Sequence, residues 1–479
     1  MTVFVVIVAV VAVLALLGLV HRWLWVRLVR DTTRPGGPAR RAGTVLAFAL
    51  PLLSLAALLA GRAGAPFWLQ RVVAWPGFMW LAVLLYLTLA MLVAEPLRRV
   101  WLRRIARNTA AGAAAATAAP ATDAAPGGGL AAQPPPGPDG PRPKEGAGRG
   151  TAPQGPAAPE ADAPAPEAVP ATAAVRVQTP AGTAASQPAV AGAGTAPQGP
   201  EAAGGVTRRV FVARTLGGVA VAAAGVTVGN GAYGVLRGPR VKRVQVPLAR
   251  LPRAAHGFRI AVVSDVHLGP ILGRAHTQRI VDTVNRTQPD LIAVVGDLVD
   301  GNVHDLGPAA EPLRQLRSRH GSFFVTGNHE YFSGAQQWVD HVRELGLTPL
   351  ENARRELPHF DLAGVNDVQG EKEGKGPDFQ AALGDRDRSR ASVLLAHQPV
   401  VIDEAVRHGV DLQLSGHTHG GQLWPGNYLA ELANPTVAGL ERYGDTQLYV
   451  SRGAGAWGPP VRVGAPSDIT VVELASYHT

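Results

Sequence analysis

The 479-residue chain contains no cysteine, and only 17% of its residues are charged. The absence of cysteine excludes disulfide bonds and metal sites built on thiolates, and it leaves the redox compartment open. Hydrophobic residues make up 47% of the chain, and glycine (56) and proline (40) are in excess. This composition is not that of one ordinary globular domain, and it favours a membrane region combined with a low-complexity segment.

The net charge of +9 is distributed unevenly. From residue 241 onward, 23 Lys and Arg stand against 27 Asp and Glu, a net charge of −4. The first 240 residues hold the remaining 22 basic and 9 acidic residues, a net charge of +13. Because basic residues beside apolar runs set membrane orientation, the basic excess needs no nucleic acid to explain it, and no nucleic-acid partner is expected.

Three uncharged apolar runs within residues 1–107 are long enough to span a bilayer. They are residues 1–20, 42–61 and 72–94. A cleaved signal peptide is the alternative for the first run, but the basic start and the small-residue cleavage site typical of one are missing. The sequence therefore predicts three transmembrane helices joined by basic cytoplasmic loops.

The arginines around these runs predict their orientation. Arginines cluster at positions 27–41, after the first run, and at positions 98–107, after the third, whereas the segment between the second and third runs holds only Arg62 and Arg71. By the positive-inside rule, the N-terminus is expected outside, and the chain leaves the third run in the cytoplasm.

Residues 108–206 are rich in Ala, Pro and Gly. The sequence Gly-Thr-Ala-Pro-Gln-Gly-Pro occurs twice, at 150–156 and at 194–200, without the apolar periodicity of a solenoid. Such a segment cannot bury enough apolar surface to offset the conformational entropy of the chain. It is predicted to be a disordered linker.

A fourth uncharged run, residues 215–236, follows the pair Arg208-Arg209. We expect residues 207–240 to form a fourth transmembrane helix, so that the protein is multi-pass and its C-terminal domain is extracytoplasmic. A buried or interfacial helix is the alternative, and it would leave that domain inside. The paired arginines also resemble a twin-arginine export signal.

Residues 241–479 alternate short β-rich runs with amphipathic stretches. Strands are predicted at 259–264, 291–295, 322–326, 392–396, 411–414, 447–451 and 469–474, and helices at 275–287, 309–319, 335–345 and 400–407. Alternation of this kind predicts an α/β layered domain, and the segment is long enough to bury a full core.

Five of the predicted strands end in potential metal ligands. The sequences at these ends are Ser264-Asp265-Val266-His267, Gly296-Asp297-Leu298-Val299-Asp300, Gly327-Asn328-His329-Glu330, Ala396-His397 and Gly416-His417-Thr418-His419-Gly420. Each motif alone is common in ordinary loops, but α/β sheets place their sites at such strand ends. Five in succession indicate one site, and alternation along an extended chain predicts that His417 and His419 point the same way.

The ligand types predict the chemistry of this site. Carboxylate, carboxamide and imidazole groups without thiolate suit divalent Mn, Fe or Zn. Seven such side chains are too many for one ion with open positions, and they match the number needed for two. A carboxylate such as Asp297 can bridge two ions about 3.5–4 Å apart, an arrangement that activates a bridging hydroxide and holds a phosphoryl group for attack.

The order Asp-x-His, Gly-Asp-x-x-Asp, Gly-Asn-His-Glu, His and Gly-His-x-His resembles the calcineurin-like metallophosphoesterase superfamily. The sequences Ser-Asp-Val-His-Leu-Gly-Pro, Gly-His-Thr-His-Gly-Gly-Gln and the tail from Arg452 resemble its bacterial membrane-associated branch of YaeI- and YkuE-like phosphodiesterases. The resemblance covers about residues 243–475. It implies a layered sandwich of two mixed sheets flanked by helices, here preceded by an all-α transmembrane region and the linker.

The resemblance also implies a role for each site residue. One metal ion would take Asp265, His267 and His419, the other would take Asn328, His397 and His417, and Asp297 would bridge them. His329 would protonate the leaving alkoxide, Asp300 would orient His329, and Glu330 would at most hold the loop. The implied activity is hydrolysis of a phosphoester, as a phosphodiesterase, by a metal-bridging hydroxide.

Two functional hypotheses follow. In the first, the membrane anchor brings the site near lipid, so that a phospholipid or a lipid-linked phosphoester is the substrate. In the second, the domain is a non-catalytic ectodomain that binds metal and phosphorylated ligands as a sensor or an assembly partner. Trp424 and Trp457, in loops near the site, are candidates for an apolar rim, with ordinary packing as the alternative.

Overall fold

The computed structural model describes residues 2–117 and 207–477. Most of the predicted linker therefore lies outside the described residues. Its predicted start at residue 108 falls within helix α3, which continues to Thr117 because this stretch is rich in alanine, the residue with the highest helix propensity. Residues 1–111 and 206–479 belong to one compact unit.

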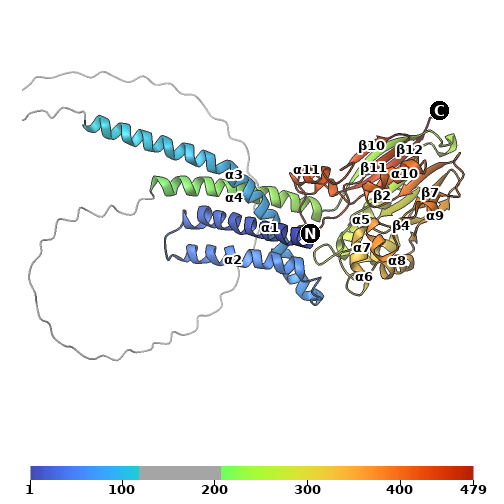
Figure 1. Ribbon diagram of the computed structural model, residues 1–479, viewed down its shortest axis with the longest axis horizontal. Helices are drawn as coiled ribbons and strands as arrows, with labels where there is room; N and C mark the ends of the chain where they lie inside the picture. The colour runs from blue at the N-terminus through green and yellow to red at the C-terminus, as the bar shows by residue number, and fades with distance from the viewer. Residues whose placement is uncertain (1, 118–206, 478–479) are drawn as a thin grey trace, which may run out of the picture. The chain divides into compact units, whose positions relative to one another are not determined.

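Four helices in the described residues are long and apolar enough to cross a membrane (Figure 1). They are α1 (Thr2–Trp25, continued by a π-helical turn at Val26–Arg30), α2 (Pro38–Leu59), α3 (Phe67–Thr117) and α4 (Arg208–Leu236). Helices α1, α3 and α4 share an apolar cluster that includes Leu24, Leu87 and Ala224. The small residues of α4 allow this close approach.

The C-terminal region contains two six-stranded mixed sheets, as the resemblance implies. The first has the order β1-β12-β2-β3-β4-β5 and the second β10-β11-β9-β8-β7-β6. The strands are β1 (Arg240–Leu248), β2 (Phe258–Val263), β3 (Leu291–Val295), β4 (Ser322–Val325), β5 (Thr348–Pro349), β6 (Ala353–Glu356), β7 (Phe360–Gly364), β8 (Ala391–Leu395), β9 (Leu412–Ser415), β10 (Gly439–Tyr443), β11 (Thr446–Val450) and β12 (Asp468–Ser476).

The two sheets pack face to face, and helices cover their outer faces. Side chains of both sheets, among them Ile260, Phe323 and Leu412, form the core between them. Helices α5 (Arg274–Arg286), α6 (Val303–Ala310) and α8 (Ala335–Glu344) pack on the first sheet. Helices α9 (Phe379–Leu383) and α10 (Ile402–Arg407) pack on the second. Two further short helices, α7 (Asn328–Ser333) and α11 (Gly426–Glu431), lie in loops.

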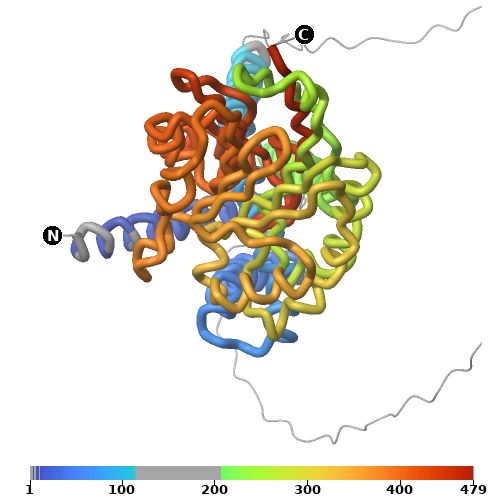
Figure 2. The backbone as a smooth tube through the Cα atoms, turned by 90° about the vertical axis from the view of Figure 1, so that its right-hand side faces the viewer, coloured from blue at the N-terminus to red at the C-terminus, as the bar shows by residue number. Residues whose placement is uncertain are grey.

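Parallel pairing aligns the strands that precede the predicted ligands. Strands β2, β3 and β4 are mutually parallel in the first sheet, and β7, β8, β9 and β11 are parallel in the second. The C-terminal strand β12 lies between β1 and β2 in the first sheet, and Figure 2 shows this red strand beside the green start of the domain. The carboxyl ends of the central strands of each sheet therefore meet at one edge.

The helix predicted at 309–319 is wrong. The structure has α6 up to Ala310, then a 3-10 turn at Glu311–Gln315 and an irregular segment. Pro312 lacks an amide hydrogen to continue an α-helical ladder, and it is buried at the start of the 3-10 turn.

Candidate metal centre

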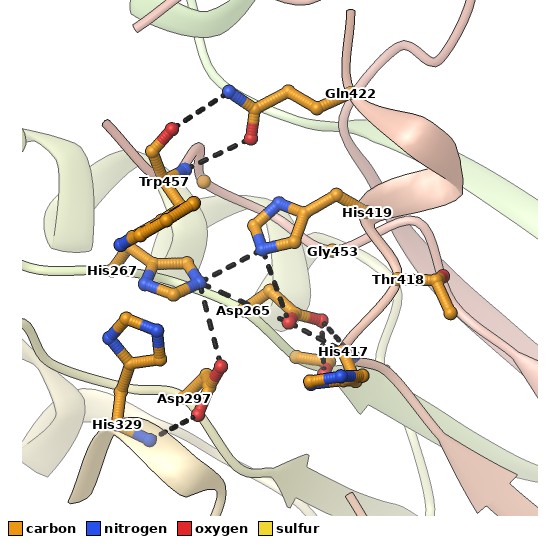
Figure 3. Close-up of polar contacts among 12 residues, drawn as sticks. Asp265, His267, Asp297, His329, His417, Thr418, His419, Gln422, Gly453 and Trp457 are labelled. Carbon is orange, nitrogen blue, oxygen red and sulfur yellow. Dashed lines mark hydrogen bonds and ion pairs between the residues drawn. The ribbon is translucent and has the colours of Figure 1, made fainter. Parts of the chain in front are cut away.

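The loops after β2, β3, β4, β8 and β9 bring together all seven side chains that the sequence predicts as metal ligands. The Asp and His among them form two adjoining groups, and within each group the ligand atoms lie within 4.8 Å of one another. The first group is Asp265, His267 and His419, and the second is Asp297, His397 and His417. Figure 3 shows the carboxylates and imidazoles of the centre directed toward one another.

The first group is tightly packed. His267 Nε2 lies 2.9 Å from His419 Nε2 and 4.0 Å from Asp265 Oδ1, and His419 Nε2 lies 3.4 Å from the same carboxylate oxygen. All three residues are buried. Two imidazole nitrogens this close together, facing a buried carboxylate, form a natural position for a cation.

The second group is centred on the Asp297 carboxylate. His397 Nε2 lies 3.1 Å from Asp297 Oδ2, and the His417 Nδ1 atom lies 3.0 Å from the amide oxygen of Asn328. The same Asp297 Oδ2 atom is 3.8 Å from His267 Nε2 of the first group. One carboxylate oxygen therefore faces both groups, as a bridging ligand would.

Hydrogen bonds on the outer side of the imidazoles determine which nitrogen faces the centre. The Nδ1 atom of His397 donates to the carbonyl of Val295 at 2.9 Å, which directs its Nε2 atom inward. This buried Nε2 has no hydrogen-bond partner in the described residues, in spite of its distance to Asp297. An inward nitrogen of this kind, which a metal ion can take once its proton is lost, fits a metal ligand.

Asp300 contacts two imidazoles with one oxygen atom. Its Oδ1 lies 2.9 Å from His267 Nδ1 and 2.7 Å from His329 Nδ1. The sequence predicts only the contact with His329. The second contact orients His267 so that its Nε2 atom faces the first group. Asp300 lies in the loop after β3, as Asp297 does, but nothing in the sequence indicates its pairing with His267.

The backbone at the centre adopts a conformation that non-glycine residues rarely accept. Five predicted ligands have positive φ angles, a left-handed conformation that costs about 1–3 kcal/mol each. They are Asp265 (52°), His267 (48°), Asp297 (51°), His417 (72°) and His419 (52°). Strain concentrated on one set of polar side chains indicates a functional constraint rather than an ordinary set of loops.

This conformation corrects one argument from the sequence. His417 and His419 both reach the centre, but through left-handed backbone in a turn, not through alternation along a strand. They also belong to different groups, which agrees with the two roles that the resemblance implies. Gly416 is required before them, because a Cβ atom there would overlap Ser264 and Asp265.

The electrostatics of the centre are those of tightly coupled charges. Burial lowers the pKa of His267, but the carboxylates of Asp300, Asp297 and Asp265 outweigh it and raise that pKa to about 9. Burial raises the pKa of Asp297, yet the neighbouring imidazoles, His397 first, hold it well below its usual value. Burial dominates at Asp265, whose pKa is raised. The buried carboxylates thus hold compensating positive charge, which divalent ions can supply in place of protons.

Glu330 and Arg462 support the centre from outside. The Glu330 carboxylate is buried and accepts hydrogen bonds from the backbone N–H groups of Gly327 (2.6 Å), Asp297 (3.0 Å) and Leu298 (2.8 Å), so it holds two ligand loops together. Arg462 donates to the carbonyl of His419 at 3.0 Å and also contacts its ring. Its other hydrogen bonds go to the backbone carbonyls of Gly455 and Ala465.

One side of the centre is accessible. Asn328, His329 and His417 are partly exposed, whereas the other predicted ligands are buried. Phe332 and Trp457, which are 62% and 52% exposed, place their rings 5.5 Å and 5.8 Å from that of His329. The exposure of Trp457 beside His329 favours the apolar rim over ordinary packing for this residue.

The donor set fits two divalent ions. It consists of nitrogen and oxygen atoms only, it includes the inward Nε2 atom of His397, and it contains one carboxylate between two groups. Hard and borderline cations such as Mn, Fe and Zn accept this combination.

Comparisons with known proteins agree with this geometry. The family model described as calcineurin-like phosphoesterase matches residues 258–421. A zebrafish (Danio rerio) transmembrane protein with metallophosphoesterase domain is 39% identical over 250 residues, which cover 49% of this chain and 57% of that protein. The chain thus spans little more than half of the zebrafish relative.

Two shorter bacterial relatives are covered almost completely. An uncharacterized metallophosphoesterase of Aquifex aeolicus is 34% identical over 240 residues, which are 49% of this chain and 91% of the relative. The uncharacterized metallophosphoesterase YkuE of Bacillus subtilis is 30% identical over 288 residues, which are 57% of this chain and 98% of the relative. The chain belongs to the calcineurin-like metallophosphoesterase family, in the branch that includes YkuE.

Proposed function

We propose that the protein is a membrane-anchored, dinuclear metal-dependent phosphoester hydrolase that acts on phosphodiesters. The observation that carries the proposal is the position of Asp297, whose Oδ2 atom faces His267 of one group and His397 of the other. In this assignment Asp265, His267 and His419 would hold the first ion. Asn328, His397 and His417 would hold the second, and Asp297 would serve both.

When bound, two divalent ions supply an activated water molecule and neutralise charge on the phosphoryl group. The protein's own contribution is positioning and proton transfer. His329 stands at the accessible side of the centre with Nδ1 bonded to Asp300, so its Nε2 is available to donate a proton to the leaving oxygen. A protein that only binds phosphate has no need of such a donor, and this favours the enzyme over the non-catalytic sensor.

Hydrolysis of bis-p-nitrophenyl phosphate with added Mn²⁺ tests the proposal. Asn328→Ala removes one ligand of the second ion and should lower turnover by at least about a hundredfold, since loss of a ligand disables the two-ion site. Asn434→Ala, at a loop asparagine that only caps a nearby carbonyl, is the matched control. Wild-type turnover in Asn328→Ala would reject the site assignment.

A lipid-linked phosphodiester is the substrate class that the surroundings favour. Besides Phe332 and Trp457, the loop and helix α11 that follow His419 expose Trp424 (49%), Tyr428 (59%) and Leu429 (71%). Tyr86 of α3 donates a hydrogen bond to the carbonyl of Trp424 at 3.0 Å, so this apolar surface adjoins a helix of membrane-spanning length. Faster hydrolysis of phospholipids than of soluble nucleotides is expected, and the reverse preference would reject the lipid hypothesis.

The proposed orientation places the C-terminal domain outside the cytoplasm, with α4 as the fourth membrane span. The cysteine-free chain makes this directly testable, because a single introduced thiol is the only target for a maleimide. In intact cells, Ser389→Cys should react with a membrane-impermeant maleimide, whereas Thr109→Cys should react only after lysis. Both positions are exposed. Labelling of Thr109→Cys alone in intact cells would reverse the topology.

A further inference from the structure

A cavity lies between the C-terminal half of α4 and the segment from Arg462 to Ser467. Its volume is about 560 Å³, within the range of ordinary ligand sites. Its lining includes Val226, Gly231, Gly234, Arg237, Arg240 and Arg462.

The cavity is strongly cationic. Three arginines line it, and none of its described lining residues is acidic. The donors of buried Arg462 are used by backbone carbonyls and by His419. The guanidinium groups of Arg237 and Arg240 form no hydrogen bond or ion pair within the described residues, and that of Arg237 lies 5.8 Å from the centre of the Tyr233 ring. Two exposed guanidinium groups are therefore available to an anionic ligand.

The polarity of the cavity changes along α4. From Val226 to Arg237 the helix rises about 16 Å, at about 1.5 Å per residue. Val226 is 72% exposed and lies on the apolar part of a helix that is long and hydrophobic enough to cross a membrane. Arg237 and Arg240 follow the end of that apolar run. An apolar end joined to a cationic end at the expected membrane boundary matches a lipid with a charged headgroup.

The wall of the cavity is fixed by direct packing. Gly231 lies so close to the loop that a Cβ atom there would approach Val461 Cγ1 to 2.7 Å, and its carbonyl accepts a hydrogen bond from the Arg462 N–H at 3.3 Å. One turn on, a Cβ atom at Gly234 would meet nothing within 4 Å. The two glycines have different consequences: the first allows α4 to touch the domain, and the second leaves the cavity open.

We propose that this cavity binds an anionic phospholipid, with the headgroup phosphate between Arg237 and Arg240 and an acyl chain along Val226. Guanidinium groups bind phosphate through paired, charge-assisted hydrogen bonds. The attraction must come from these side chains, because the C-terminal end of a helix carries partial negative charge. This site is independent of the proposed hydrolysis and does not require the metal centre.

The test uses the full-length chain in neutral detergent and measures retained lipid by native mass spectrometry. The probes are phosphatidylglycerol, phosphatidylcholine, and glycerol 3-phosphate as a soluble phosphate without acyl chains. Phosphatidylglycerol is expected to bind at least about tenfold more tightly than phosphatidylcholine, because the choline cation of phosphatidylcholine neutralises its phosphate and is repelled by the two guanidinium groups; a tenfold preference corresponds to about 1.4 kcal/mol. Glycerol 3-phosphate is expected to displace it only weakly.

Three variants locate the binding. Arg237→Gln with Arg240→Gln should weaken phosphatidylglycerol binding by about a hundredfold and remove the preference over phosphatidylcholine. Gly234→Leu fills the cavity with little risk to folding and should abolish retention. Gly229→Leu is the matched control, because a side chain there also meets nothing within 4 Å but lies outside the cavity.

Retention of phosphatidylglycerol by Gly234→Leu at the wild-type level would overturn the proposal, and so would equal loss in Gly229→Leu. Equal binding of the two lipids would also contradict the proposal, because the arginines would then not distinguish an anionic headgroup from a zwitterionic one. Binding of glycerol 3-phosphate without retention of either lipid would also overturn it, because the cavity would then be a site for soluble phosphate.

Discussion

Replacing Asp300 by Asn removes one charge from two imidazoles at once. The Asp300 Oδ1 atom lies 2.9 Å from His267 Nδ1 and 2.7 Å from His329 Nδ1. An amide oxygen can still accept both hydrogen bonds, so the geometry should survive while the charge is lost. A hydrogen bond to a charged group contributes about 1–1.5 kcal/mol more than a neutral one, which is about tenfold for each contact.

The two contacts should affect two different quantities. The contact with His267 orients a predicted ligand, so its weakening should lower Mn²⁺ affinity by about 10–100-fold. The contact with His329 holds the proposed proton donor, so turnover at saturating Mn²⁺ should fall by about tenfold or more. His329→Gln should lower turnover at saturating metal and leave metal affinity nearly unchanged.

The assay is hydrolysis of bis-p-nitrophenyl phosphate across a Mn²⁺ titration. It gives two separate quantities, the Mn²⁺ concentration at half of the limiting rate (the metal midpoint) and the limiting rate itself. Asp305→Asn removes the same charge nearby, at the start of α6, and should behave as the wild type. If Asp300→Asn kept both the wild-type metal midpoint and the wild-type limiting rate, neither contact would have the role assigned to it.

Three further predictions concern the supports of the centre. Gly416→Ala should lower the midpoint of thermal unfolding, because the overlap of the new methyl group with Ser264 and Asp265 costs about 1–3 kcal/mol of folding free energy. Gly273→Ala, with open space around the new methyl group, should leave the midpoint unchanged, and equal midpoints in the two variants would contradict this packing. Glu330→Gln replaces a buried acceptor of three N–H groups, so amide hydrogen exchange at these groups should accelerate, and unchanged protection would refute the role of that carboxylate. Neighbouring carboxylates raise the pKa of His267 to about 9 and that of His397 well above its usual value, so metal must displace a proton from each imidazole and the logarithm of metal affinity should rise with pH between pH 6 and 8; a flat profile in calorimetry would contradict it.

The sequence is informative about the centre because its ligands follow buried strands. Runs such as Leu291–Val295 are recognisable from composition, and parallel pairing places their ends at one edge. All seven predicted ligands accordingly lie together in the structure. The layered pair of sheets was predicted as well, on the basis of the same motifs and their family resemblance.

What the sequence does not indicate are contacts between side chains that tertiary packing brings together. The second contact of Asp300, with His267, and the contact of Arg462 with His419 depend on how loops cross, and no spacing encodes them. The left-handed backbone of His417 was also missed, because non-glycine residues rarely adopt it without support from the surrounding fold. The helix predicted at 309–319 does not form, because the proline within it overrides the apolar periodicity.

The most direct test of the two-ion assignment is anomalous diffraction from Mn²⁺-loaded crystals of the full-length protein, together with elemental analysis of the metal content. The account predicts two ions per chain, about 3.5–4 Å apart, with an Asp297 carboxylate oxygen in contact with both. A single ion, or two ions that share no ligand, would contradict it.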